Sequence, residues 1–305
     1  MSKLEKTDWV THCFGRHLVD VPPNARIDQP IFEMFKEQIN LMKIRSAAEL
    51  ESVVAAREAE LKTQEHDTAR SMFIDRTNEP NGSISIRSWR DKDDESAIKF
   101  EAYFVAVNPF KVYLFKTSRE IGYQSGPTRI IRDIGANLTS RDPRTVPTTP
   151  GFCIEQGFIA INRLNTESFD VSVGLPGRKD VSFGISTYVQ GQVDESLLSR
   201  TSGLMGSVIG IATGTSTLRR GKHPVGPIYA EEILVAGTEK GKRLYAFKWE
   251  APGKADSIAE PHISTSLGVL EGQYKTNAES FKDDDEALAL WDAIIDSIRL
   301  RPGAV

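Results

Sequence analysis

The sequence of 305 residues contains no apolar run near the ~20 residues that a membrane-spanning helix requires. Its longest apolar stretch, residues 204–212, is interrupted by Gly206, Ser207 and Gly210. Low-complexity tracts are also missing, and 39% hydrophobic with 26% charged residues is typical of a folded globular protein. These absences exclude a helical membrane protein and a disordered chain.

An excess of positive charge is missing as well. The chain has 38 lysines and arginines against 42 aspartates and glutamates, which gives a formal net charge of −4. A protein that binds nucleic acid or an anionic membrane surface needs clustered cations to neutralise phosphates. We therefore expect neither of these partners.

The first ten residues, MSKLEKTDWV, have no apolar core and no small-residue cleavage site, so they are not a signal peptide. Taken literally, this start indicates a cytoplasmic protein. Taken as the mature form of an exported protein, it indicates that an export signal has been removed. The two interpretations remain open at this point.

The common catalytic motifs are not found. Ser207 lacks the flanking glycines of the hydrolase elbow. A phosphate-binding loop fails because six residues rather than four separate Gly214 from Gly221, and His223 stands where serine or threonine should coordinate magnesium. Five histidines without an H-E-x-x-H motif and two isolated cysteines do not make a zinc site. We expect no catalytic residue, no metal and no cofactor.

The only cysteines are Cys13, in THCFGRHLVDVP, and Cys153, in PGFCIEQGFIA. In an oxidising compartment the two could form a disulfide, whereas in the cytoplasm they could be buried free thiols that behave as small hydrophobic groups. Their spacing leaves both interpretations open. His12 and His17 flank Cys13, so a cysteine–histidine nucleophile of a hydrolase or thiol enzyme is an alternative to structural histidines at the rim of a sheet.

Two helices have clear start signals. Ser46 with Glu49, and Asp283 with Glu286, have the spacing of capping boxes, and apolar residues follow each pair at helical intervals. We interpret the acidic run at 283–285 as a helix cap rather than a cation site, because carboxylates offset the positive end of the helix dipole. A short helix is also predicted over 127–138, and residues 31–44 fit a helix or an amphipathic arm.

Strands are predicted where apolar and polar residues alternate, as in 84–87, 98–104, 112–114, 169–175, 181–188, 229–236, 243–250 and 262–270. In the first half this alternation predicts an antiparallel sheet whose other face is polar and meets water or a partner. Residues 140–151, SRDPRTVPTTPG, have three prolines and predict an unpacked linker. The expected fold is α+β with two domains, 1–145 and 146–305, each a mainly antiparallel sheet with covering helices.

Residues 216–232, STLRRGKHPVGPIYAEE, form the most unusual stretch, because charged and titratable side chains stand beside glycines and prolines. Composition alone favours a solvated hairpin loop, since surface charges are common. A protein-recognition loop is the functional alternative, since arginines suit the recognition of carboxylates. Its candidate partner-binding residues are Arg219, Arg220, Lys222, His223, Glu231 and Glu232.

Five segments, CFGRHLVDVP, PGFCIEQGFIA, LRRGKHPVGPIYAEE, YAFKWEAPG and ALALWDAIIDSIRLRPGA, follow one another along nearly the whole chain. Together they resemble the family of type VI secretion lipase immunity proteins, which protect bacteria from family-4 phospholipase effectors. The resemblance implies a two-domain inhibitor without enzyme activity or cofactor. Its partner would be a cognate lipase effector, bound in a 1:1 complex so that the lid or active-site entrance is blocked.

The resemblance also implies export to the periplasm, with the signal removed from this chain. It maps no binding motif onto numbered positions, but it places residues 216–232 in a family-typical stretch and so favours the partner-binding interpretation there. A structural adaptor protein, whose sheet faces bind a scaffold partner, is the remaining alternative.

Overall fold

The computed structural model describes residues 6–200, 213–239, 242–269 and 280–305, so the apolar stretch at 204–212 lies outside the described residues. The chain forms two compact units that are not its consecutive halves. The first unit holds Met1–Ile31 and Arg163–Val305, and the second holds Phe32–Asn162. The division into residues 1–145 and 146–305 stays a prediction about which parts fold separately.

Twelve of the described strands are neighbours in one sheet, in the order β14-β15-β16-β17-β13-β12-β3-β4-β8-β7-β6-β5. The fold is α+β with mostly antiparallel strands, as predicted, but the expectation of two separate sheets is wrong. The reason is strand β3 (Arg26–Met34), whose last residues pair with β4 (Glu37–Met42) while β12 (Glu167–Gly174) is its neighbour on the other side. The other strands are β5 (Phe73–Asn78), β6 (Ile84–Trp89), β7 (Ala97–Ala106), β8 (Lys111–Glu120), β13 (Val181–Tyr188), β14 (Thr213–Lys222), β15 (Glu231–Glu239), β16 (Lys242–Ala251) and β17 (His262–Val269).

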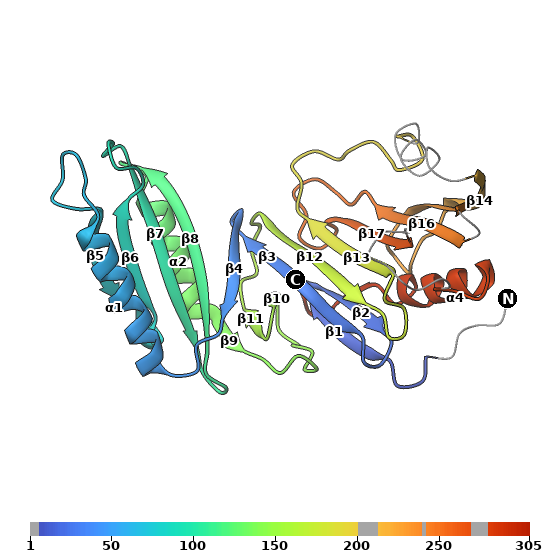
Figure 1. Ribbon diagram of the computed structural model, residues 1–305, viewed down its shortest axis with the longest axis horizontal. Helices are drawn as coiled ribbons and strands as arrows, with labels where there is room; N and C mark the ends of the chain where they lie inside the picture. The colour runs from blue at the N-terminus through green and yellow to red at the C-terminus, as the bar shows by residue number, and fades with distance from the viewer. Residues whose placement is uncertain (1–5, 201–212, 240–241, 270–279) are drawn as a thin grey trace. The chain divides into compact units, whose positions relative to one another are not determined.

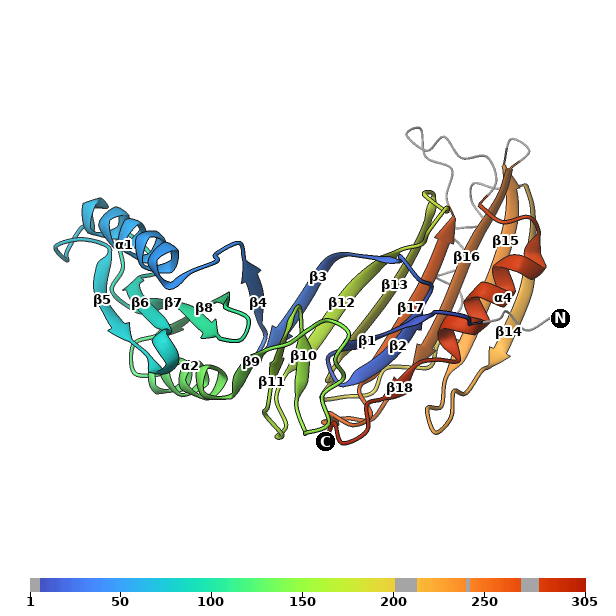
Figure 2. The same cartoon turned by 90° about the horizontal axis from the view of Figure 1, so that it is seen from below.

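The second unit has three layers. Helices α1 (Ala47–Thr63) and α2 (Ser125–Asn137) lie on opposite faces of strands β5 to β8, as Figure 1 and Figure 2 show. The face under α1 carries Ile84, Ile86, Tyr103 and Val105, which pack with Leu50 and Val54 of the helix. The face under α2 carries Phe104, whose ring lies 3.6 Å from the position of a Cβ at Gly135.

The polar face predicted for the strands of this unit is not open to water. Glu101 of β7 points toward α1 and is only 1% exposed. Arg57 of α1 donates to its carboxylate at 2.7 Å, and Lys99 and Lys116 lie 3.5 and 3.9 Å away. Burial alone raises the pKa of Glu101, but the Arg57 hydrogen bond and the three cations bring it below its ordinary value. A charged strand position therefore belongs to the interior because α1 supplies its counter-charge.

The two predicted capping boxes are confirmed, with one difference. Ser46 accepts a hydrogen bond from the Glu49 amide at 3.1 Å, and the Glu49 carboxylate accepts from the amide of Arg45 at 2.8 Å. Helix α4 (Asp284–Ile295) begins in the same way with Asp283 as its cap. Each carboxylate thus reaches the residue before the cap rather than the cap itself. Within the described residues, no helix is both long and apolar enough to cross a membrane.

In the first unit, one face of strands β12 to β17 is covered by α4 and by a second sheet. Trp291 of α4 packs edge-on against Phe183 and Phe247. Phe14 of the second sheet packs on Phe169 of the same face at 5.9 Å. This sheet consists of β1 (Val10–Phe14), β2 (His17–Val21) and β18 (Arg299–Leu300), so the first two strands of the chain pair with its last strand (Figure 2). The opposite face of β12 and β13 is polar, with exposed Ser172 and Ser182.

Residues 31–44 form neither a helix nor an arm. They belong to the β3–β4 hairpin, in which Phe35 and Lys36 make a two-residue turn with φ of 57° and 68°. Phe32, Met34, Ile39 and Ile44 are the buried residues of this range. The apolar spacing looked helical because it was counted across a turn, where the period-two alternation of the strands is interrupted.

The proline-rich residues 141–151 contain no helix or strand, and they do not connect the two units. They lie in the second unit next to a small sheet of β9 (Leu138–Ser140), β10 (Phe152–Ile154) and β11 (Gly157–Ile159). The Arg141 guanidinium donates to the carbonyls of Asp142, Pro143 and Thr145 at 3.2, 3.1 and 2.8 Å. Because these carbonyls lack partners in a regular element, one arginine holds the segment in place.

Candidate partner-binding site

The stretch 216–232 is a strand hairpin rather than a loop along its whole length. Strand β14 runs to Lys222 and β15 starts at Glu231, with Lys222 opposite Glu231 in the register. Only residues 223–230 connect the strands, and a bridge between Val225 and Ile228 closes their tip. The prolines that suggested a loop lie inside this short connection, where they remove no hydrogen bond of the sheet.

Three of the six candidate residues point inward, toward α4. Arg219 donates to Asp292 of α4 at 3.0 Å and lies 2.8 Å from Glu232. His223 contacts Glu232 through Nδ1 at 2.8 Å and Asp296, the residue after the last turn of α4, through Nε2 at 3.1 Å. These residues bind the hairpin to the helix, so their charges are satisfied within the chain.

Glu232 is the centre of this cluster. It is 4% exposed, and besides Arg219 and His223 it accepts a hydrogen bond from the indole of Trp291 at 3.1 Å. Its hydrogen bond raises the pKa of His223 above the ordinary value, which burial opposes and the nearby Asp296 carboxylate reinforces. The raised pKa favours the protonated imidazole, which can donate to Glu232 and Asp296 at the same time and offsets the repulsion between these two carboxylates.

The other three candidates lie on the outer side. Arg220 and Lys222 are exposed; Arg220 donates to the carbonyl of Leu198 at 3.2 Å, and the Lys222 ammonium lies 5.8 Å from the ring centre of Tyr229. Glu231 is 5% exposed and accepts from the Leu198 amide at 2.9 Å. Burial raises the pKa of Glu231, but its hydrogen bonds bring it below the ordinary value. Of the six, Arg220 and Lys222 are the ones that a partner could reach.

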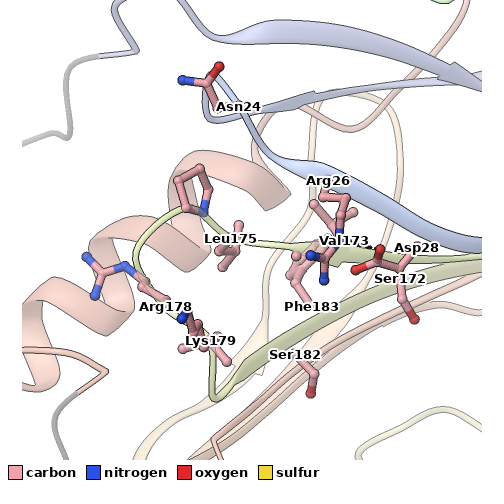
Figure 3. A pocket seen from close by; sticks show the side chains of 13 residues that line it. Asn24, Arg26, Asp28, Ser172, Val173, Leu175, Arg178, Lys179, Ser182 and Phe183 are labelled. Atoms are coloured by element: carbon pink, nitrogen blue, oxygen red, sulfur yellow. Dashed lines mark hydrogen bonds and ion pairs between the residues drawn. The ribbon is translucent and has the colours of Figure 1, made fainter. Parts of the chain in front are cut away.

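A pocket that sequence reasoning did not find lies between two turns of the first unit (Figure 3). It has a volume of about 480 Å³. One wall follows the turn from β2 into β3, and the other follows the turn between β12 and β13. Its charged and polar lining consists of Asn24, Arg26, Asp28, Arg178 and Lys179 with Ser172 and Ser182, and its apolar lining includes Val173, Leu175 and Phe183.

Two of the cations that line this pocket have carboxylate partners within the chain. Arg26 donates to Asp28 at 2.5 Å. Arg178 donates to Glu286 at 2.5 Å and packs over the ring of Phe281 at 4.5 Å. The only signal in the sequence was the run Leu-Pro-Gly-Arg-Lys at 175–179, a turn followed by two cations, and nothing in it indicates the residues at 24–28 that face it.

A second pocket, of about 430 Å³, lies at the tip of the β14–β15 hairpin and is mainly apolar. Its lining includes Ile228 and Tyr229 of the hairpin, Pro252, Pro261 and the buried His17. Burial, with a further contribution from the Arg16 charge, lowers the pKa of His17 to about 4. His17 is therefore a neutral imidazole at ordinary pH.

The cysteines do not supply a nucleophile. Both Cys13 and Cys153 are disulfide-bonded, and the chain has no free cysteine. His12 stacks on Phe14 at 5.6 Å, and His17 is neutral and buried. A thiolate that a histidine could activate is thus missing in this form of the protein. In the part of the chain that the structure describes, no group of three or more His, Cys, Asp or Glu side chains could hold a metal ion.

Comparison with protein families gives matches over both parts of the chain. Residues 10–121 match the model of the Tle cognate immunity protein 4 N-terminal domain, and residues 145–303 match that of its C-terminal domain. The chain belongs to the Tle cognate immunity protein 4 family. The resemblance seen in the sequence is thereby confirmed, and with it the conclusion that this is a type VI secretion immunity protein and not an enzyme.

Solved structures of this family agree with the assignment. The apo structure of the immunity protein TplEi of the type VI secretion system of Pseudomonas aeruginosa is 36% identical, with a TM-score of 0.90 over 98% of this chain and 99% of that one. The crystal structure of the Tle4–Tli4 complex matches with the same values. TplEi complexed with "L" peptide matches at 36% identity and a TM-score of 0.84, over 98% of this chain and 100% of that one. No match was found among curated proteins.

Proposed function

We propose that this immunity protein binds a cognate phospholipase effector of the Tle4 type in a 1:1 complex and inhibits it. The observation that carries the proposal is the match, at 36% identity over 98% of the chain, to the structure of the Tle4–Tli4 complex. A relative that covers the whole chain at this identity supports a partner of the same class. Which effector of this class the chain binds depends on the side chains of its own binding surface.

The proposed mechanism is inhibition without chemistry. A lipase must open an apolar active-site mouth to reach lipid, so an inhibitor that binds the closed state better than the open one keeps the enzyme inactive. We propose that this chain covers the lid or the active-site entrance. Tight inhibition then needs a total interface of about 1,600 Å² or more. The periplasm is the proposed compartment, and the disulfide-bonded cysteines support it because disulfides persist in oxidising surroundings.

Within the stretch 216–232, we propose that Arg220 and Lys222 contact the effector. Both are exposed on the outer side of the hairpin. Arg219, His223 and Glu232 instead position the hairpin on α4, and Glu231 orders the neighbouring segment through the amide of Leu198. This division narrows the binding candidates from six residues to two.

The test is an inhibition titration with the purified effector encoded beside this chain's gene. Lipase activity should fall linearly with added immunity protein and vanish at a molar ratio of one, and the two proteins should co-elute in gel filtration. An unrelated lipase is the control and should keep its activity. If the cognate effector remains fully active at a tenfold molar excess of the immunity protein, the proposed function is wrong.

A further inference from the structure

We propose that the pocket between the β2–β3 turn and the β12–β13 turn receives an acidic side chain from a peptide segment of the effector. The inference rests on the proposed function, because it names a contact of the same partner. It concerns a place in the first unit that lies apart in sequence from the 216–232 hairpin, and it is carried by shape, charge and lining of the pocket.

The walls of the pocket are formed by turns that are held in place. In the β2–β3 turn the Ala25 amide donates to Pro22 at 3.1 Å, and Asn24 has a left-handed φ of 63°. In the β12–β13 turn the Arg178 amide donates to Leu175 at 3.2 Å, and Gly177 takes a φ of 73°. Because both turns are closed by backbone hydrogen bonds, binding there requires little ordering of the backbone.

The charge of the pocket favours an anion. Three cations, Arg26, Arg178 and Lys179, and one carboxylate, Asp28, line it, although the whole chain has a net charge of −4. Arg26 and Arg178 have carboxylate partners. Lys179 is exposed and makes no ion pair with any residue that the structure describes. An incoming carboxylate would therefore find one unshared ammonium group on one wall and the donors of Arg26, whose side chain is 78% exposed, on the other (Figure 3).

The base of the pocket is apolar. Val173 and Phe183 are 1% and 0% exposed, and Leu175 is 6% exposed, yet all three line the pocket. These side chains leave little room for water beneath the pocket, so an ion pair formed above them is less screened, which strengthens the electrostatic attraction. Cations on both walls with a single carboxylate among them fit one carboxylate of a peptide better than a multiply charged inorganic anion. The Asp28 carboxylate in the same wall also disfavours a dianion such as phosphate.

Gly174 offers a way to change the wall without changing a charge. A Cβ at this position would meet the Asp28 carboxylate at 3.1 Å and a terminal nitrogen of Arg26 at 3.5 Å. The Arg26 Cβ, at 3.6 Å, is at ordinary contact distance, and the two closer neighbours are ends of flexible side chains, so Gly174→Ala should move the Arg26–Asp28 pair while the strand itself stays intact. Gly184 of the neighbouring strand is a matched control, because a Cβ there would meet only Ser266 Oγ at 3.5 Å and the Val171 carbonyl at 4.0 Å.

The experiment measures the dissociation constant for the cognate effector by calorimetry, for the wild-type chain and four variants. Lys179→Glu should raise Kd at least tenfold at 0.1 M salt and less at 0.5 M, because salt screens an exposed charge. Gly174→Ala should raise Kd at least threefold. Gly184→Ala and Lys254→Glu, a charge reversal elsewhere in the first unit, should stay within twofold of wild type.

Urea unfolding and circular dichroism establish that every variant is folded before its affinity is compared. If the wild-type chain binds while Lys179→Glu and Gly174→Ala both stay within twofold of it, this inference is overturned and the proposed function stands. If the wild-type chain itself shows no binding, the proposed function and this inference fail together. Restoration of Lys179→Glu binding by a glutamate-to-lysine change in the effector would support the inference directly.

Discussion

Arg16 and Glu167 form a buried ion pair in which the guanidinium donates to both carboxylate oxygens, at 2.5 and 3.0 Å. Arg16 follows β1 and Glu167 begins β12, and a third donor of Arg16 reaches the carbonyl of Ala304 at 2.6 Å. One side chain thus connects the start of the chain, its end and the large sheet within the first unit. Burial raises the pKa of Glu167, and the hydrogen bond from Arg16 opposes that rise.

We predict that removal of either partner strongly destabilises the protein. Arg16→Met or Glu167→Met leaves one buried charge without its counter-charge, which costs about 3–5 kcal/mol of unfolding free energy. The double variant should lose clearly less than the sum of the two single losses, because neither charge then remains. Urea unfolding of all four proteins at pH 7 measures this. If each single variant lost less than about 1 kcal/mol of unfolding free energy, the ion pair would not be essential for the stability of the fold.

A second prediction concerns acid stability. Because the pKa of His17 is lowered to about 4 in the folded protein and is about 6.5 when unfolded, the unfolded state binds a proton first as the pH falls. The contribution of His17 to stability is fully present above pH 6.5 and is lost progressively down to pH 4, by about 3 kcal/mol in all. The wild-type chain should therefore lose more stability over this range than His17→Gln.

Unfolding free energies of both proteins at pH 7.5, 6, 5 and 4.5 give the comparison. The difference between the two slopes isolates His17, since all carboxylates titrate in both proteins. Equal slopes would mean that folding does not lower the pKa of His17.

The third prediction separates the two sides of the β14–β15 hairpin. Arg219→Glu places a third carboxylate beside Glu232 and Asp292, so it should cost about 2–3 kcal/mol of stability. Arg220→Glu and Lys222→Gln change exposed groups and should stay within about 0.5 kcal/mol of wild type. Thermal and urea unfolding test these values.

Binding to the effector then decides the role of the outer side. If this side contacts the partner, Arg220→Glu raises Kd at least tenfold although its stability is unchanged. If Kd stayed within twofold of wild type for both Arg220→Glu and Lys222→Gln, the outer side of the hairpin would be a solvated surface that does not contact the effector.

The fourth prediction concerns the cysteines. We predict one disulfide, Cys13–Cys153, which closes a loop of about 140 residues. In the chain-entropy relation, reduction should then lower the unfolding free energy by about 4–5 kcal/mol. Thiol titration of the urea-unfolded, unreduced protein should find no reactive thiol, and two after reduction. The double Cys→Ser variant is the control and should not respond to reductant; two free thiols before reduction would contradict the prediction.

Local signals in the sequence were sufficient for several elements. The caps Ser46 and Asp283 mark the starts of α1 and α4, because a cap and its partner carboxylate lie within three or four residues of each other. The strands with strict alternation, such as β12 and β13, were also predictable from period two. The β3–β4 hairpin was not, because its tight turn is built from Phe35 and Lys36, residues that carry no turn signal.

The charged residues were less predictable than the elements that carry them. By its position in an alternating strand, Glu101 is expected to face solvent, but Arg57 of helix α1 covers it. The sequence around Glu232 is typical of a loop, but Trp291 and His223 donate hydrogen bonds to its carboxylate. A charge becomes structural only when a group far along the chain compensates for its lost hydration. No pattern within a window of a few residues contains that information.

Sequence alone predicted the α+β class, because helix caps and strand alternation are properties of short stretches of chain. The five ordered segments carried the resemblance to the lipase immunity proteins, which the family match then confirmed. Tertiary structure decided that one sheet runs through β3, that three of the six candidate side chains hold α4 rather than a partner, and that residues 24–28 share a pocket with 172–183. These outcomes depend on contacts between residues that are far apart along the chain, and only packing brings such residues together.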